Sequence, residues 1–169
     1  MDAQMQDIER AFFNAMAAGW AQDTEKSAGT DFPHMKLISF ADGDYQVVDG
    51  YLSPPQEARR GDGFSAGMTV ISESGIPVWT MQYGGRYAKQ AIPFLKECLH
   101  RAYVKERLFY GGRGPHFVRG DRFTYVNNIV QTGFNNFSGE EYVYDLNEQC
   151  MGFHWYRGMA LLRVPERKW

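Results

Sequence analysis

The chain contains 169 residues with a net charge of −2, from 18 basic and 20 acidic side chains, and 44% of its residues are hydrophobic. A chain of this length buries about two-thirds of its unfolded surface in one core, so we expect a single domain over residues 1–169 that folds without a metal or a disulfide. The near balance of charge argues against broad electrostatic binding of nucleic acid. No apolar run approaches the roughly 20 residues of a membrane span, so no membrane partner is expected.

The amino terminus lacks the features of an export signal. The sequence MDAQMQDIERAFFNAM has neither the basic start nor the continuous apolar stretch of a secretory signal. We therefore expect a cytoplasmic protein in which the two cysteines, Cys98 and Cys150, are reduced thiols. No HxxxH or CxxC spacing indicates a zinc site, and the sequence predicts no cofactor.

Apolar residues recur at three- and four-residue steps near the amino terminus, which is the spacing of an amphipathic helix. This stripe predicts a helix over 5–20 and consists of Met5, Ile8, Phe12, Phe13, Met16 and Trp20. Polar residues with a glycine and a proline follow at 21–34 and predict a loop.

Two strand-like runs come next, at 35–40 (MKLISF) and 45–52 (YQVVDGYL), on either side of a turn at 41–44. Together they predict a β-hairpin. Residues 53–63 contain two prolines, which cannot donate to a central sheet ladder, and therefore form a connection. A further hairpin is expected at 64–85.

The second part of the chain repeats this order. A helix is predicted over 91–107, with Pro93 in its first turn, from the helical spacing of Ile92, Leu95, Leu99, Ala102 and Tyr103. The glycine-rich stretch 109–116 ends this helix. Runs at 116–118 and 122–130 then flank a Gly-Asp turn, a hairpin follows at 137–158, and 159–164 is a last strand or its extension.

Residues 64–85 and 137–158 have equal length and align without a gap. They share five positions: Phe64/Phe137, Ser65/Ser138, Val70/Val143, Tyr83/Tyr156 and Gly85/Gly158. With the matching order of elements, this predicts two pseudo-repeated units, about 5–88 and 91–164, each of one helix and a four-stranded antiparallel meander. Connections between strands are too short for a parallel sheet. The predicted fold class is therefore α+β, with the helices against one face of a mainly antiparallel sheet in one compact domain.

The hairpins carry short motifs that are similar to those of a known family. These are WTMQYGGR at 79–86, RGP at 113–115, GEE at 139–141, and FH with RG at 153–158. On these motifs the chain resembles a bacterial domain of unknown function that occurs alone and as the carboxy-terminal part of helix-turn-helix (XRE-type) regulators. The resemblance spans most of residues 35–158. Only one helix is predicted ahead of the first strand, so the regulator role is not implied, and neither is an activity.

Arg86 and Arg113 each stand beside glycines, where a guanidinium next to open backbone suits a carboxylate or phosphate ligand. The alternative is a structural ion pair, for instance with Glu141. Because Tyr83 and Tyr156 end corresponding strands, we expect these five residues to gather at the junction of the two halves and to line a partly open pocket.

Aromatic side chains extend this candidate site. Trp79, Met81 and Tyr83 alternate onto one sheet face, as do Phe153 and Trp155. Most such residues are expected in the core, but 12 Phe, 10 Tyr and 4 Trp are more than two helices can cover, which indicates a half-polar concavity. The candidate ligand-binding residues are Arg86, Arg113, Glu141, Tyr83, Tyr156, Trp79 and His154.

Three functions remain open at this point. The first is a non-enzymatic binding module for a small anionic or aromatic ligand at the junction of the two halves. The second is a protein-interaction module of the inhibitor or immunity type, with exposed aromatics as its contact. The third is a metal-independent hydrolase or nuclease that uses His154 and His116 as acid and base with Glu141 and the arginines. A closed pocket, a flat aromatic patch and a histidine–carboxylate pair in a cleft would distinguish them.

Overall fold

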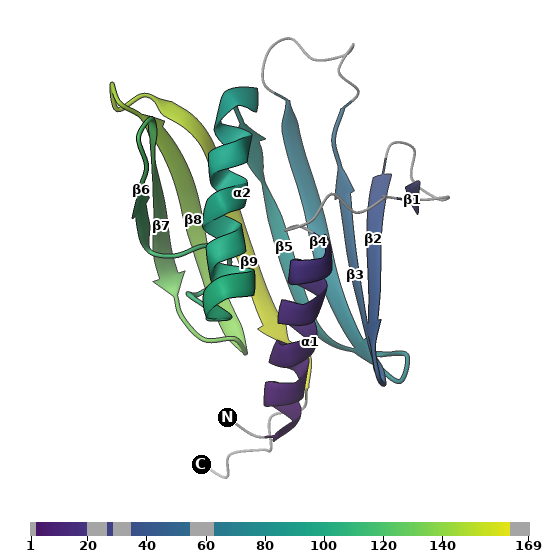
Figure 1. The fold of residues 1–169 in the computed structure, drawn as a ribbon. Coiled ribbons are helices and arrows are strands. Elements are labelled where there is room, and N and C mark those ends of the chain that lie inside the picture. Colours follow the sequence, from purple (N-terminus) through teal and green to yellow (C-terminus); the bar gives the residue numbers. More distant parts are fainter. Residues whose placement is uncertain (1–2, 20–26, 29–34, 55–62, 163–169) are drawn as a thin grey trace.

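The computed structural model describes residues 3–19, 27–28, 35–54 and 63–162. Helix α1 is followed by strands β1 to β5, a short helical segment with α2 at its centre, and strands β6 to β9 (Figure 1). The bounds are α1 Ala3–Gly19, β1 Ser27–Ala28, β2 Met35–Asp42, β3 Tyr45–Leu52, β4 Phe64–Glu73, β5 Ile76–Tyr87, a 3₁₀ turn Lys89–Ala91, α2 Ile92–His100, a π-helical continuation Arg101–Glu106, β6 Phe117–Arg119, β7 Phe123–Gln131, β8 Asn136–Asp145 and β9 Cys150–Ala160.

The strands form one antiparallel sheet in the order β1-β2-β3-β4-β5-β9-β8-β7-β6. Strands that are consecutive in the chain are neighbours everywhere except at the centre, where β5 pairs with β9. In that pair Tyr83 lies directly opposite Tyr156. The sheet is therefore two antiparallel meanders joined along their last strands.

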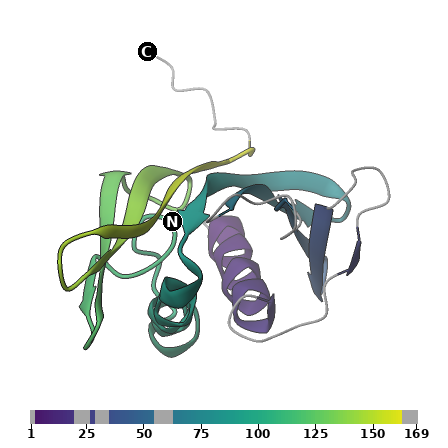
Figure 2. The same cartoon turned by 90° about the horizontal axis from the view of Figure 1, so that it is seen from above.

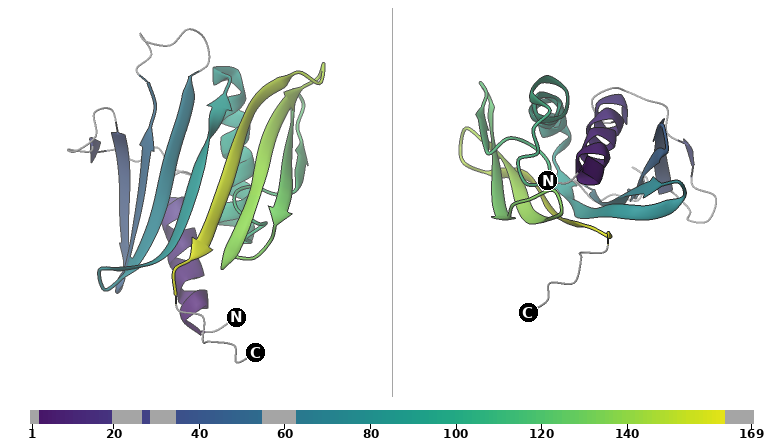
Figure 3. Two further views of the ribbon diagram at one scale, coloured as in Figure 1. Left: turned by 180° about the vertical axis from the view of Figure 1, so that it is seen from behind. Right: turned by 90° about the horizontal axis from the view of Figure 1, so that it is seen from below.

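Both helices lie side by side within the concave face of the curved sheet (Figure 2). In the described part of the chain, the opposite face carries no helix (Figure 3). Helix α1 packs on β2 and β3, and its buried residues include five of the predicted stripe: Met5, Ile8, Phe12, Phe13 and Met16. Trp20 lies outside the described residues. In the second helical segment Leu95, Leu99, Ala102 and Tyr103 are buried, whereas Ile92 is exposed because it begins the helix.

The predicted α+β class and the antiparallel sheet with helices on one face are confirmed. The turn at 43–44 lies within the predicted turn at 41–44. In the turn between β4 and β5, Ser74 and Gly75 both have positive φ, as in a two-residue type I′ hairpin. Residues 159–160 extend β9 rather than form a separate strand. Two residues of the predicted 21–34 loop, Ser27 and Ala28, pair with β2 as β1.

The strand register corrects the ungapped alignment of the two hairpins. Tyr83 pairs with Gly67 and Tyr156 pairs with Gly139, so the last strands are offset by 73 residues but their partners by only 72. A shift of one residue places a side chain on the other face of a sheet. Accordingly Phe64 is 58% exposed while Phe137 is fully buried. These two phenylalanines are therefore not equivalent, and the superposition of two repeated units stays a prediction.

Candidate functional site

The inner face of the sheet carries a buried polar cluster centred on Glu141 of β8. Its Oε1 lies 2.6 Å from Arg113 Nε and accepts a 2.6 Å hydrogen bond from the Tyr87 hydroxyl. Its Oε2 accepts a 2.5 Å hydrogen bond from the Tyr125 hydroxyl. Glu141 is 0% and Arg113 is 4% exposed. Burial, the largest single influence, would lower the pKa of Arg113, but Glu141 together with Tyr103, Tyr87 and Tyr125 outweighs it, so the pKa is raised.

Tyr83 and Tyr156, which face each other across the β5–β9 pair, each donate to a buried side chain on the inner face. The Tyr83 hydroxyl bonds to both carboxylate oxygens of Asp49, at 2.9 and 3.1 Å. The Tyr156 hydroxyl bonds to Asn127 Oδ1 at 2.6 Å. Burial and the Asp49 charge raise the pKa of Tyr83, so this hydroxyl stays protonated and acts as a donor.

His154 is buried beside this cluster on β9. Its ring stacks on Tyr83 and lies 4.7 Å from the Tyr87 ring, centre to centre. Neither ring nitrogen has a hydrogen-bond partner among the described residues. Burial, with a contribution from the Arg113 charge, lowers the pKa of His154 to about 2, so the imidazole is neutral at ordinary pH.

The structure thus brings together five of the predicted site residues, Tyr83, Tyr156, Arg113, Glu141 and His154, but in the interior. All five are at most 4% exposed, so they do not line the partly open pocket expected from the sequence. The reason is that α2 and its π-helical continuation cover this face. In addition, the polar side chains of the cluster already accept hydrogen bonds from tyrosine hydroxyls. The Arg113–Glu141 contact is the structural ion pair considered as the alternative.

The other predicted residues lie elsewhere. Trp79 belongs to the aromatic core, where it packs on Phe12 and Phe134. Arg86 is paired with Phe64, so it lies on the outer face of the sheet. His116 is exposed just before β6. Three strand intervals separate β6 from β9, about 14 Å at 4.8 Å per interval, so His116 and His154 do not form an acid–base pair.

The described residues contain neither a cluster of side chains that could hold a metal ion nor a disulfide. No group of three or more His, Cys, Asp or Glu side chains within 3–19, 27–28, 35–54 and 63–162 could hold a metal ion. Both cysteines are unpaired, with Cys98 buried on α2 and Cys150 exposed at the start of β9. Burial, reinforced by the Glu141 charge, raises the pKa of Cys98 to about 12, which makes it a poor nucleophile.

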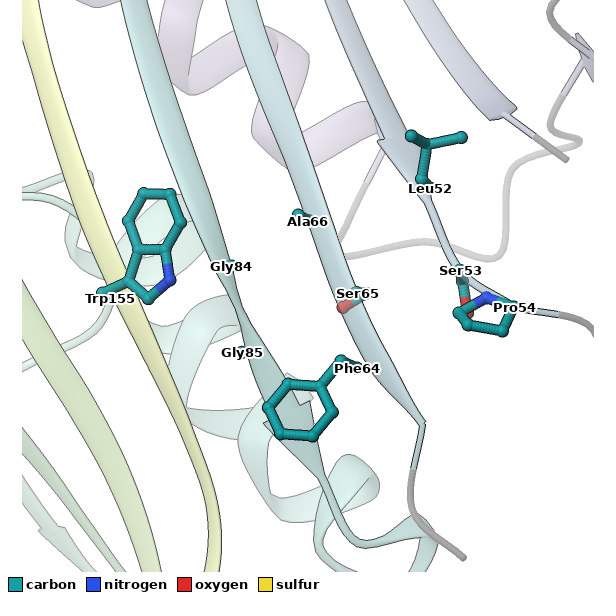
Figure 4. Close-up of a pocket in the computed structure, with 9 residues that line it drawn as sticks. All are labelled: Leu52, Ser53, Pro54, Phe64, Ser65, Ala66, Gly84, Gly85 and Trp155. Carbon is teal, nitrogen blue, oxygen red and sulfur yellow. The ribbon is translucent and has the colours of Figure 1, made fainter. Parts of the chain in front are cut away.

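The outer face of the same strands carries an open groove of about 450 Å³ (Figure 4). Its floor consists of small residues of β4 and β5. Trp155 of β9 forms one side, and the end of β3 forms the other. The lining residues are Leu52, Ser53, Pro54, Phe64, Ser65, Ala66, Gly84, Gly85 and Trp155.

The position of the Trp155 indole requires a glycine at the residue opposite it on β5. The register pairs Trp155 with Gly84, and a Cβ at Gly84 would lie 2.9 Å from Trp155 Cζ2 and 3.1 Å from its Nε1. The indole therefore lies over the bare backbone of β5, with its nitrogen edge turned toward Gly84 (Figure 4). Trp155 remains 43% exposed and Phe64 58% exposed. Large aromatic side chains that stay this accessible around a hollow are typical of a binding surface.

Sequence reasoning noted Trp155 but assigned its face incorrectly. Tyr156 is the residue of β9 that meets Tyr83 on the inner face, so Phe153 and Trp155 point outward. Phe64, Ala66 and Gly84 were missed as site residues. The available signal was two short stretches of consecutive small residues, Ser65-Ala66-Gly67 and Gly84-Gly85, which leave space beside a large neighbour where β4 and β5 pair.

The structure is thus an α+β domain with an open antiparallel sheet, two helices on one face of that sheet and a groove bordered by aromatic side chains on the other. The family model for "Domain of unknown function (DUF5680)" matches residues 58–160, and the chain belongs to this family. No curated protein and no solved structure matches the chain. No helix among the described residues is long and apolar enough to cross a membrane.

Proposed function

We propose that this protein is a non-enzymatic binding module whose ligand is a small, planar, largely apolar molecule held in the outer groove. The observation that carries the proposal is the trough of Ala66, Gly84 and Gly85 between two accessible aromatic side chains, Trp155 and Phe64. Its volume of about 450 Å³ is within the usual range for small-molecule sites. The proposed site lies over β4 and β5 on the outer face, with Trp155 of β9 at one side. The sequence-based expectation was a pocket at the junction of the two halves, lined by Arg86, Arg113, Glu141, Tyr83 and Tyr156.

The size of the groove sets the expected affinity. A bicyclic aromatic ligand that removes about 400 Å² of apolar surface from water, its own and the protein's together, gains about 10 kcal/mol at 25 cal/mol per Å². Association costs at least about 4 kcal/mol. About 6 kcal/mol remains, which corresponds to a dissociation constant of tens of micromolar.

The test uses N-phenyl-1-naphthylamine, a neutral probe whose fluorescence rises in apolar surroundings. Titration with the wild-type protein should give saturable binding, and Trp155→Ala or Phe64→Ala should weaken it about tenfold. Phe117→Ala is the matched control, because Phe117 is 57% exposed on β6 and does not line the groove. Equal binding by wild type and Trp155→Ala, or an equal loss in Phe117→Ala, would contradict the proposal.

A protein-interaction module is the second candidate. It is favoured by a row of aromatic rings that continues across the outer face from the groove: Phe64 contacts Phe153, Phe153 contacts Tyr142, and Tyr142 stacks on Tyr144. Absence of probe binding would favour this candidate over the first.

The proposal also carries expectations that come from the sequence alone. They are a bacterial and cytoplasmic setting, kinship with domains fused to helix-turn-helix regulators, and two pseudo-repeated units that meet at β5 and β9. Equivalent positions of Tyr83 and Tyr156 after superposition of the two meanders would support the last of these.

A further inference from the structure

The centre of the convex outer face is formed by four strands, β4, β5, β9 and β8 (Figure 3). Most side chains that point outward from three of them are aromatic or apolar: Phe64, Ala66, Met68 and Val70 on β4, Phe153, Trp155 and Met159 on β9, and Tyr142 and Tyr144 on β8. Phe64, Met68, Trp155 and Met159 are exposed. Aromatic and methionine side chains are enriched in the cores of protein interfaces, and a contiguous exposed apolar surface marks an interaction site.

Two residues of opposite charge, Glu140 and Arg157, lie beside each other at the middle of this surface. Glu140 on β8 is opposite Trp155, and Arg157, two residues further along β9, is opposite Ser138. Both are exposed, and among the described residues they form no ion pair with each other. Glu140 accepts a 2.6 Å hydrogen bond from the Tyr142 hydroxyl. A surface with both signs side by side is complementary to itself, because a copy turned by 180° can present its arginine to this glutamate.

We infer that the partner of this surface is a second copy of the chain, packed outer face to outer face about a two-fold axis. The axis runs across the strands, between the positions of Trp155 and Arg157 on β9. It places Arg157 of the second copy over Trp155 and beside Glu140, where a guanidinium stacks on the indole and pairs with the carboxylate. The same axis sets Met159 of the second copy against Phe153, and Met68 of the second copy over Ala66. Each contact is made twice, as in any two-fold interface.

The area of the surface fits a weak but specific dimer. The outer face is convex, so the contact is confined to the four central strands. A strand spacing of about 4.8 Å and a rise of about 3.4 Å per residue give four strands of eight residues an area of about 500 Å². Two copies thus bury about 1,000 Å² in total, the lower bound for a specific interface, so we expect a dissociation constant in the micromolar range. Each copy then covers the groove of the other, although the dimer itself does not depend on the proposed function of the groove.

Sedimentation velocity tests the dimer at concentrations from about 1 to 200 µM, a range that brackets a micromolar dissociation constant. The average mass of the wild-type protein should rise from that of one chain to that of two. Arg157→Glu and Glu140→Arg should each weaken association at least about tenfold, because like charges then face each other across the axis. The double variant Glu140→Arg/Arg157→Glu should associate like the wild type, and so should an equimolar mixture of the two single variants, since opposite charges face each other again.

Lys105→Glu is the matched control, because Lys105 is exposed on the helical side of the sheet, and this charge reversal should leave association unchanged. Identical melting curves at the lowest concentration establish that each variant is folded. The inference is overturned if the wild type keeps the mass of one chain throughout, if the single reversals have no effect, or if neither the double variant nor the mixture restores association. A monomeric chain that binds the neutral probe through Trp155 would overturn the dimer and leave the groove proposal standing. A dimer that binds no probe would support the dimer and reject the groove proposal.

Discussion

The two faces of the central strand pair differ in almost every physical respect, although alternate residues of the same strands build them. On the inner face, Tyr83, His154 and Tyr156 are fully enclosed, and charge is neutralised by partners at hydrogen-bond distance. On the outer face, Gly84 and Trp155 form a hollow that is open to solvent. The residues at each position, rather than the strands, decide whether a face becomes a core or a site.

The comparison also gives the reason why we propose the outer groove, rather than the buried polar residues, as the ligand site. A buried charge is tolerated only when it is paired and hydrogen-bonded, and the Glu141 carboxylate already accepts two tyrosine hydroxyls and contacts Arg113. A ligand would have to displace these contacts. We therefore expect substitutions on the inner face to change the free energy of unfolding and those on the outer face to change binding.

The largest effect is expected from Glu141→Ala. It leaves the Arg113 charge buried without its carboxylate partner and two tyrosine hydroxyls without their acceptor, which should lower the free energy of unfolding by about 3–5 kcal/mol. Urea denaturation followed by circular dichroism measures this change. The double variant Arg113→Met/Glu141→Leu should lose less than Glu141→Leu alone, because no unpaired charge remains. If the double variant is no more stable than the single one, the ion pair does not dominate the cluster.

Adjacent glycines on β5 test the two faces directly. A Cβ at Gly85 points inward, where it would overlap the Phe153 carbonyl oxygen and lie 2.5 Å from His154 Cδ2. The three atoms nearest to a Cβ at Gly84 all belong to the Trp155 side chain, which can move. Gly85→Ala should therefore cost about 3 kcal/mol of stability, the upper end for overpacking. Gly84→Ala should cost about 1 kcal/mol or less while weakening probe binding. Thermal melts together with the probe titration would reveal a reversed order.

A further effect on stability, smaller than that of Glu141→Ala, concerns pH. Unfolded histidine binds a proton below its ordinary pKa of 6.5, but burial and Arg113 lower the pKa of folded His154 to about 2. Between these values the unfolded state binds the extra proton, so the free energy of unfolding falls as the pH decreases below 6.5. At about 1.4 kcal/mol per pH unit, the loss from this group reaches about 2–3 kcal/mol near pH 4.5. The contribution is fully restored above pH 6.5.

His154→Phe removes this titration and keeps a planar ring between Tyr83 and Tyr87. The difference in urea stability between pH 7 and pH 4.5 should therefore be about 2–3 kcal/mol smaller in this variant than in the wild type. Parallel pH profiles for the two proteins would show that His154 is protonated without penalty in the folded state.

The fold class and most strand positions could be predicted from the sequence because they depend on local patterns. The α1 stripe and the glycine turns each act over a few residues. The pairing of β5 with β9 was harder to predict from the sequence, since it joins segments that are far apart in the chain. The one-residue offset between the hairpins is not visible in an ungapped alignment, and it reverses the faces of Phe64 and Phe137.

The residues of the candidate site were also hard to predict from local sequence patterns. Sequence proximity to glycines suggested that Arg113 is accessible, but the cover provided by α2 is a tertiary property, and it closes that region. Trp155 could be placed on the outer face only after Tyr156 was known to pair with Tyr83. The residue types that could bind a ligand can thus be identified from the sequence. The face of the sheet on which each residue lies can be assigned only once the strand register is known.

The central strand pair also bears on how the chain folds. Neighbouring strands elsewhere in the sheet follow each other in sequence, but β5–β9 partners are 65 residues apart at Tyr87–Gly152 and 81 apart at Trp79–Ala160. Each meander can form by local contacts, while their union requires closure of a long loop that carries α2. We therefore expect the β5–β9 amide protons to become protected last in pulsed hydrogen exchange during refolding, so that the groove and the buried cluster are completed in the same late step.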